Sequence, residues 1–283
     1  MGLRFSKMHG LGNDFVIVDC REHALPLDAD GIRLLGDRHV GVGFDQLLTI
    51  ETARDPSCAF AYGIWNTDGS RSGQCGNGLR CVARWLARDG AIGLGSTRLE
   101  SPSGPVAVEL LADGCIRADM GEPRFTPTDI PLRTDACGDR DEYIFDVAGM
   151  PLRIGAVSMG NPHAVLEVAD TGLAAVGELG SRIEAAAAFP QGCNVGFAQV
   201  LARDAIRLRV WERGVGETLA CGSGACAAVA VLRRRAKLEA AVRVELPGGT
   251  LLIEWQGPGH PVWMSGPATF VFEGEYGDNG GQR

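Results

Sequence analysis

The chain of 283 residues carries 27 lysine and arginine residues against 35 aspartate and glutamate residues, a formal net charge of −8 at pH 7. Its hydrophobic content of 45% is typical of a soluble globular protein, and no run of about 18 uncharged apolar residues predicts a membrane span. Without a basic patch, the acidic balance argues against a nucleic-acid partner and favours a small molecule. The first residues lack the pattern of a signal peptide, so we expect a cytoplasmic protein.

In the first half, short apolar runs bounded by polar and glycine residues predict strands at residues 14–19, 45–50 and 60–65. A helix is predicted to begin at Cys75 and to stop at Gly90. Residues 106–120 alternate in polarity about Asp113 and Gly114, which is the pattern of a β-hairpin.

In the second half, similar runs predict strands at residues 163–168, 195–201, 206–212 and 243–255. A second helix is predicted after Cys221, and its residues 225–232 are apolar on every side. A helix of this kind must be buried, which in a strand-rich protein suggests a sheet wrapped around it. Residues 269–273 form a surplus strand that we expect to return to the first half.

The two halves repeat one another in the same order. The matching segments are 12–18 with 160–166, 42–46 with 195–199, 74–78 with 220–224, 99–104 with 244–249, and 120–123 with 264–267. Repetition in one order at nearly one spacing indicates a duplicated domain. A proline-rich connector at residues 121–133 separates the copies.

We therefore predict an α+β protein of two pseudo-symmetric lobes, with the active site in the cleft between them. Each lobe is expected to be a mixed, mostly antiparallel β-sheet wrapped around a central helix. The predicted domains are residues 1–121 plus 268–283, which carry Cys75, and residues 122–267, which carry Cys221.

Nine cysteines, an odd number, predict free thiols and not a disulfide framework. No C-x-x-C pair occurs and the five histidines do not cluster with the cysteines, so we predict no metal site. Seven cysteines are expected to be packing residues: Cys20, Cys58, Cys81, Cys115, Cys137, Cys193 and Cys226. Cys75 and Cys221 differ because each precedes a glycine-rich turn and both recur in the duplication.

A helix N-terminus offers unpaired backbone N–H groups and a partial positive charge, which together attract an anion such as a carboxylate. The same field is expected to lower the pKa of a cysteine thiol placed there. Two such cysteines, on opposite faces of one carbon, would provide a base and an acid for inverting a stereocentre next to a carboxylate. The pattern thus favours a racemase or epimerase.

Six segments of the chain carry a resemblance to a known family. They are "MHGLGNDF" (8–15), "GFDQLL" (43–48), "NTDGSRSGQCGNGLRC" (66–81), "MGNPHAV" (159–165), "ERGVGETLACGSGACA" (212–227) and "LPGG" (246–249). Together they resemble the diaminopimelate epimerases, over about residues 3–273. The resemblance implies a homodimeric isomerase without pyridoxal phosphate, other cofactor or metal. It would interconvert LL- and meso-diaminopimelate on the route to lysine and peptidoglycan.

The resemblance also implies roles for individual residues. Cys75 and Cys221 would be the acid–base pair, one resting as thiolate and the other as thiol, and His163 and Glu212 would tune their pKa values. The implied substrate-binding residues are Asn13, Gln46, Asn66, Gly76, Asn77, Asn161, Asn194, Glu212, Arg213, Gly222 and Ser223.

Two other functions stay open. The chain could be a cofactor-independent racemase or isomerase for another substrate, such as proline, although a monocarboxylate would leave Arg213 without a partner. Alternatively, Cys75 and Cys221 could form a thiol redox switch or a binding module, if their Cα atoms approach within about 7 Å.

Overall fold

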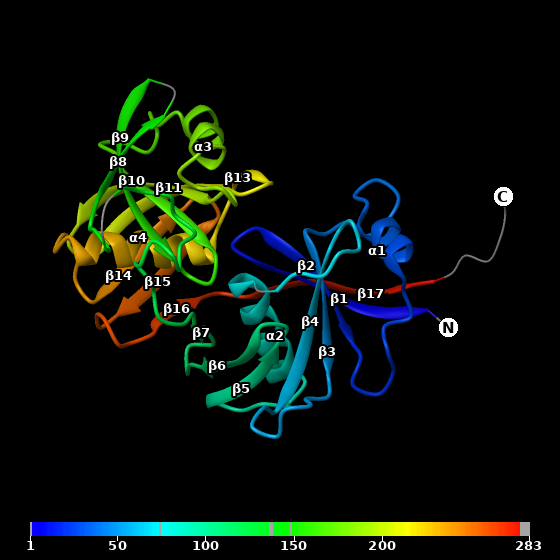
Figure 1. Cartoon of the computed structure of the whole chain (residues 1–283). Coiled ribbons are helices and arrows are strands. Elements are labelled where there is room, and N and C mark those ends of the chain that lie inside the picture. The colour runs from blue at the N-terminus through cyan, green and yellow to red at the C-terminus, as the bar shows by residue number, and fades with distance from the viewer. Residues whose placement is uncertain (1, 74, 136–137, 148, 278–283) are drawn as a thin grey trace. The chain divides into compact units, whose positions relative to one another are not determined.

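The computed structural model describes residues 2–73, 75–135, 138–147 and 149–277, so Gln74 and Cys137 lie outside the described residues. The chain divides into two compact units, which are Met1–Ala118 with Gly266–Arg283, and Asp119–Ser265. Both units combine strands with a few helices (Figure 1), which confirms the predicted α+β class. Within the described residues, no helix is long and apolar enough to cross a membrane.

The first unit is a mixed sheet with two helical crossovers. Its elements are β1 (Leu3–Gly10), β2 (Asn13–Asp19), α1 (Ala29–Gly36), β3 (Gln46–Glu51), β4 (Phe60–Asn66), α2 (Gly76–Arg88), β5 (Gly95–Ser101), β6 (Gly104–Leu110), β7 (Ile116–Asp119) and β17 (Thr269–Tyr276). The parallel pairs are β2 with β3, across α1, and β4 with β5, across α2. Parallel neighbours need such a crossover, whereas the antiparallel pairs β1–β2, β3–β4, β5–β6 and β6–β7 do not.

The second unit has the same order of pairings. Its elements are β8 (Tyr143–Val147), β9 (Met150–Ser158), β10 (Pro162–Glu167), α3 (Val176–Glu184), β11 (Asn194–Ala202), β12 (Ala205–Glu212), β13 (Gly216–Thr218), α4 (Gly222–Arg234), β14 (Ala241–Leu246), β15 (Gly249–Trp255) and β16 (Val262–Gly266). Here β10 and β11 are parallel across α3, and β12 and β14 are parallel across α4. The pairs β9–β10, β11–β12, β14–β15 and β15–β16 are antiparallel.

This common topology corrects one of the predicted internal matches. Phe15 lies opposite Gln46 in the first unit, and His163 lies opposite Asn194 in the second. Gln46 is therefore the counterpart of Asn194, and the predicted match of residues 42–46 with 195–199 is wrong. Backbone hydrogen bonds fix the register of paired strands, so two segments of similar sequence can occupy different positions in their sheets.

Each unit surrounds its second helix with strands. α2 packs against β1, β2, β3 and β6, and α4 packs against β9, β10, β11, β12 and β15 (Figure 1). Every residue from Ala225 to Leu232 in α4 is buried, as predicted from its apolar sequence. In α2 the buried residues include the polar Asn77 and Arg80, which the apolar pattern did not indicate.

The predicted helix ends and turns are confirmed. α2 ends at Arg88 with Asp89 as its C-cap, and the next residue, Gly90, has a φ of 77°, a left-handed conformation that glycine adopts without strain. β6 and β7 form the predicted hairpin, whose turn includes Gly114 with φ of 83°. The surplus strand at the end of the chain is β17, which pairs antiparallel with β1.

Candidate active site

Cys75 stands at the start of α2, at the N-cap position, with an extended backbone (φ −152°, ψ 106°). The backbone N–H of Gly78 donates to the Cys75 sulfur, with 3.4 Å between the two heavy atoms. A side chain at Gly78 would meet Leu48 at 3.3 Å and Phe15 at 3.4 Å, so glycine suits the close packing of this turn against the sheet. The turn therefore holds the thiol where the helix presents its N–H groups.

Two amide side chains lie beside this thiol. The Asn13 Oδ1 atom is 3.8 Å from the Cys75 sulfur, which donates to it as a thiol, and 3.3 Å from Nδ2 of Asn77. The Nδ2 atom of Asn13 donates to the Asp45 carboxylate at 2.8 Å. Asn13 is thus held at both ends of its amide, with its oxygen facing the sulfur.

Gln46 and Asn66 lie opposite each other in the β3–β4 pair. Nε2 of Gln46 donates to Oδ1 of Asn66 at 3.0 Å, and Nδ2 of Asn66 donates to the Ser70 hydroxyl at 3.0 Å. Gln46 begins β3, Asn66 ends β4 and Asn13 begins β2. Because β2 is parallel to β3 and antiparallel pairing joins β3 to β4, these amides gather at one end of the sheet.

Cys221 occupies the equivalent N-cap position of α4 (φ −113°, ψ 108°). Its sulfur lies 3.6 Å from the Ser223 hydroxyl, and the residue is only 5% exposed. Burial, followed by the nearby Glu212 carboxyl, raises the pKa of the Cys221 thiol well above its ordinary value, although contacts with Ser223 and Gly224 oppose the rise. The expected lowering by the helix N-terminus is therefore wrong for Cys221, because desolvation of the thiolate outweighs the helix field.

Glu212 and Arg213 come at and just after the end of β12. The Glu212 carboxylate accepts a hydrogen bond from the Thr218 hydroxyl at 2.5 Å. The backbone N–H of Arg213 donates to Oδ1 of Asn194 at 2.9 Å, and its guanidinium donates to the Gln191 carbonyl at 3.0 Å. Asn194 is in this way joined to the strand that carries Glu212.

His163 is 1% exposed, and its Nε2 lies 2.9 Å from Oδ1 of Asn161. Burial, with a smaller contribution from the Arg213 cation, lowers the pKa of His163 to about 3. The imidazole is therefore neutral at pH 7 and donates to the Asn161 oxygen as the Nε2–H tautomer, since an amide oxygen accepts only.

Each unit by itself gathers the predicted residues that belong to it. The first holds Asn13, Gln46, Asn66, Gly76 and Asn77 with Cys75, and the second holds Asn161, His163, Asn194, Glu212, Arg213, Gly222 and Ser223 with Cys221. The prediction missed Asp45, which holds Asn13, and Thr218, which holds Glu212. Asp45 had a signal, because it directly precedes Gln46 within the motif "GFDQLL".

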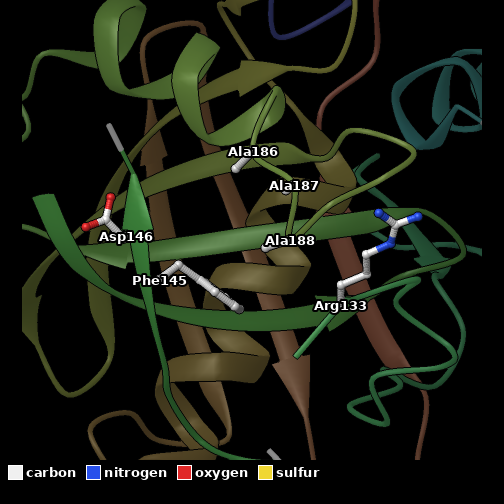
Figure 2. A pocket seen from close by; sticks show the side chains of 6 residues that line it. All are labelled: Arg133, Phe145, Asp146, Ala186, Ala187 and Ala188. Atoms are coloured by element: carbon white, nitrogen blue, oxygen red, sulfur yellow. The ribbon is translucent and has the colours of Figure 1, made fainter. Parts of the chain in front are cut away.

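The second unit also contains two cavities that include none of these residues. One, of about 290 Å³, is lined by Arg133, Phe145, Asp146, Ala186, Ala187 and Ala188. Figure 2 shows Arg133 and Asp146 on opposite sides of the alanines. The other, of about 900 Å³, is lined partly by Arg233 and Arg234 at the C-terminal end of α4. A helix of 13 residues is about 20 Å long, so this cavity lies far from Cys221 at the opposite end.

The solved structures that resemble this chain share its fold at low sequence identity. A probable proline racemase from Agrobacterium radiobacter K84, with bound carbonate, superposes with a TM-score of 0.70 at 16% identity, covering 98% of this chain and 93% of that one. A PhzF-family phenazine biosynthesis protein from Bacillus anthracis gives a TM-score of 0.68 at 15% identity, covering 97% and 99%. At such identities the likeness concerns the fold alone.

Sequence comparison is more specific. A diaminopimelate epimerase from Xanthomonas axonopodis pv. citri (strain 306) is 55% identical over 274 residues, covering 97% of this chain and 96% of that protein. One from Xanthomonas campestris pv. campestris is also 55% identical over 274 residues, with the same coverage. The family model for diaminopimelate epimerase matches residues 5–126 and 155–271, which include both N-cap cysteines. The chain belongs to the diaminopimelate epimerase family.

Proposed function

We propose that the protein interconverts LL- and meso-diaminopimelate by inverting one α-carbon, in the synthesis of lysine and peptidoglycan precursors. The names of its relatives support the substrate. The single observation that carries the chemistry is the N-cap cysteine that begins the sheet-wrapped helix of each unit. We propose further that the protein is a cytoplasmic homodimer, and that residues 1–121 with 268–283 and residues 122–267 act as two lobes on one substrate.

In this mechanism the thiolate of one cysteine removes the α-proton, and the thiol of the other gives a proton to the opposite face of the same carbon. The reaction leaves a thiol where the thiolate was and a thiolate where the thiol was, so the reverse reaction uses the same two groups. The N–H groups of Gly76, Asn77, Gly222 and Ser223 would bind the carboxylate and stabilise the carbanion. Preorganised donors of this kind contribute about 3–4 kcal/mol each to a transition state.

The two thiols rest in different environments. Cys221 is buried beside the Glu212 carboxyl, and both features favour its protonated form. Cys75 is half-buried and receives the Gly78 N–H, a bond that strengthens when the sulfur is charged. We propose that Cys75 is the resting thiolate and Cys221 the resting thiol, with Asn13 accepting the Cys75 S–H once the proton has been transferred.

The residues around Cys221 suit a substrate with charges at both ends. Arg213 can bind the distal carboxylate with a bidentate pair, and Glu212 can bind an ammonium group. Asn161 and Asn194 would fix the stereochemistry of the unreactive centre. A proline substrate, which has one carboxylate, would leave the Arg213 guanidinium unused, so the likeness to a proline racemase fold does not favour that activity.

We propose that His163 acts as a neutral residue. An imidazole with a pKa of about 3 carries no charge at pH 7, so it cannot stabilise a thiolate by charge attraction. Its contact with Oδ1 of Asn161 gives it a positioning role for that amide instead. Tuning of the second thiol then belongs to Glu212, whose carboxyl raises the pKa of Cys221 after the larger effect of burial.

The activity test uses the purified protein with reductant, LL-diaminopimelate and no added cofactor. We expect meso-diaminopimelate to form, and we expect Cys75→Ala and Cys221→Ala each to abolish its formation, because each removes one of the two proton-transfer groups. Cys58→Ala, a buried thiol outside the site, is the control. Absence of meso product with the parent protein would refute the proposed substrate, and full turnover by either site variant would refute the two-thiol scheme.

A second prediction concerns the Glu212 carboxyl. Glu212→Gln should move the alkylation of Cys221 by iodoacetamide to a lower pH midpoint, because it removes a negative charge that disfavours the thiolate. The rate is followed for each cysteine by mass spectrometry of peptides. Glu217→Gln, in β13 and paired with Arg209, is the control and should leave the midpoint unchanged. An unchanged midpoint in Glu212→Gln would show that the Glu212 charge does not contribute and that burial alone raises the pKa of the Cys221 thiol.

The third prediction is a pH dependence of stability. His163 has a folded-state pKa of about 3 against an ordinary value of 6.5, so the unfolded chain binds its proton more tightly. The stabilisation is complete above pH 6.5 and is lost as the pH falls towards 3, amounting to about 3 kcal/mol lost by pH 4.5. The free energy of unfolding in urea, measured at pH 7.5 and 4.5, should therefore decrease less between these pH values in His163→Gln than in the parent.

The exposed His260, changed to glutamine, is the control for this measurement and should follow the parental curve. An equal decrease in the free energy of unfolding in His163→Gln and in the parent would mean that the folded protein accommodates a charged imidazole at this position.

A further inference from the structure

Arg80, the fifth residue of α2, is fully buried, with 0% of its surface exposed. A buried charge is costly unless it is hydrogen-bonded. The guanidinium donates to Oδ1 of Asn77 at 2.8 Å, to the carbonyl of Gly76 at 3.4 Å and to the carbonyl of Pro267 at 3.4 Å. Its contacts therefore centre on the first turn of the helix that Cys75 begins.

These contacts fix the direction of two amides in succession. A guanidinium only donates, so the atom of Asn77 that faces it must be the oxygen, and Nδ2 of Asn77 is left to donate to Oδ1 of Asn13 at 3.3 Å. At the other end of the Asn13 amide, the Asp45 carboxylate can only accept a hydrogen bond, so the group that faces it must be the Nδ2 donor of Asn13. The Asn13 oxygen is consequently held toward the Cys75 sulfur from both directions.

The backbone leaves room for this arrangement. Gly10, the last residue of β1, lies so close that a side chain there would meet Nη2 of Arg80 at 3.3 Å and Cβ of Asn77 at 3.3 Å. Glycine at this position lets the Arg80–Asn77 pair pack directly against the strand. The pair is thus built into the fold of the first unit and is not a chance contact of a surface side chain.

The second unit lacks the guanidinium at the equivalent position. With the spacing of 146 residues that relates Cys75 to Cys221, Arg80 corresponds to Cys226 and Asn66 corresponds to Glu212. The first copy therefore has a cation in its helix where the second has a neutral thiol, and the second has a carboxylate where the first has an amide. Both differences favour negative charge on Cys75 over negative charge on Cys221.

We propose that Arg80 is a positioning residue for the Cys75 half of the site. Its buried guanidinium fixes the Asn77 amide, and through it the Asn13 oxygen beside the reacting sulfur, and its charge supports the thiolate there. The inference rests on the proposed function, in which Cys75 exchanges protons with the substrate.

The first experiment measures the pH dependence of iodoacetamide alkylation at Cys75 and Cys221 by peptide mass spectrometry. Arg80→Met should move the Cys75 midpoint to higher pH and leave that of Cys221 unchanged, because the cation lies in the Cys75 helix only. Arg84→Met, one turn further along the same helix, is the matched control and should keep the parental midpoint. Arg80→Lys, which keeps the charge, should also stay near the parent. An unchanged Cys75 midpoint in Arg80→Met would overturn the charge role.

The second experiment is a double-mutant cycle on kcat/KM for diaminopimelate, using Asn77→Ala, Arg80→Met and the two combined. Loss of a charged hydrogen bond predicts a reduction of about 10- to 100-fold for Arg80→Met. The cycle is measured at a pH above the Cys75 midpoint of every variant, where Arg80 acts only through Asn77, so the double variant should fall no more than about twofold below Asn77→Ala alone. Losses that multiply would overturn the positioning role. If Arg80→Met is not recovered folded, as judged by circular dichroism, Arg80→Gln, which also removes the charge, replaces it in the cycle.

The alkylation measurement needs no turnover. A protein without epimerase activity would refute the proposed function, whereas a parental alkylation profile in Arg80→Met would refute the role of Arg80 in an active enzyme.

Discussion

The N-terminus of a helix buried in a sheet is the constraint on which both units depend. An α-helix cannot satisfy its own first N–H groups, so the residues at this point must be small enough for a partner to approach and must include a cap. In α2 and α4 the cap is a cysteine and the next residues are glycine, a polar residue and glycine. The strands that wrap each helix fix where this end lies, and in the first unit Asn13, which begins β2, lies beside the cap sulfur.

The two units carry equivalent helix ends whose surroundings differ in charge. The shared order of parallel and antiparallel pairs keeps the cysteines in equivalent places. Charge does not follow that equivalence, because Arg80 corresponds to the neutral Cys226 in the repeat and the neutral Asn66 corresponds to Glu212. In the proposed mechanism this inequality gives the two thiols a preferred resting state, with the thiolate at Cys75 and the thiol at Cys221.

Much of the fold could be predicted because it depends on local patterns. The uniform apolarity of residues 225–232 predicted a buried helix, and alternation about Gly114 predicted a hairpin. The helices α1 and α3 were missed because each is short and contains glycines, which lower helix propensity. The raised pKa of the Cys221 thiol and the burial of Arg80 were missed for another reason. Burial of either depends on distant segments, such as Glu212 beside Cys221 and the Pro267 carbonyl against Arg80, and no local pattern records such contacts.

The measurement that tests the two-thiol account most directly is the early course of isotope exchange in deuterium oxide, starting from LL-diaminopimelate. If one thiol removes the proton and the other supplies its replacement from solvent, the first meso product carries deuterium at the inverted carbon, while the remaining LL substrate keeps protium there. NMR of the separated isomers at low conversion distinguishes the two positions. Deuterium entering the LL substrate as fast as meso product forms would contradict the account, because a single base would then serve both faces of the carbon.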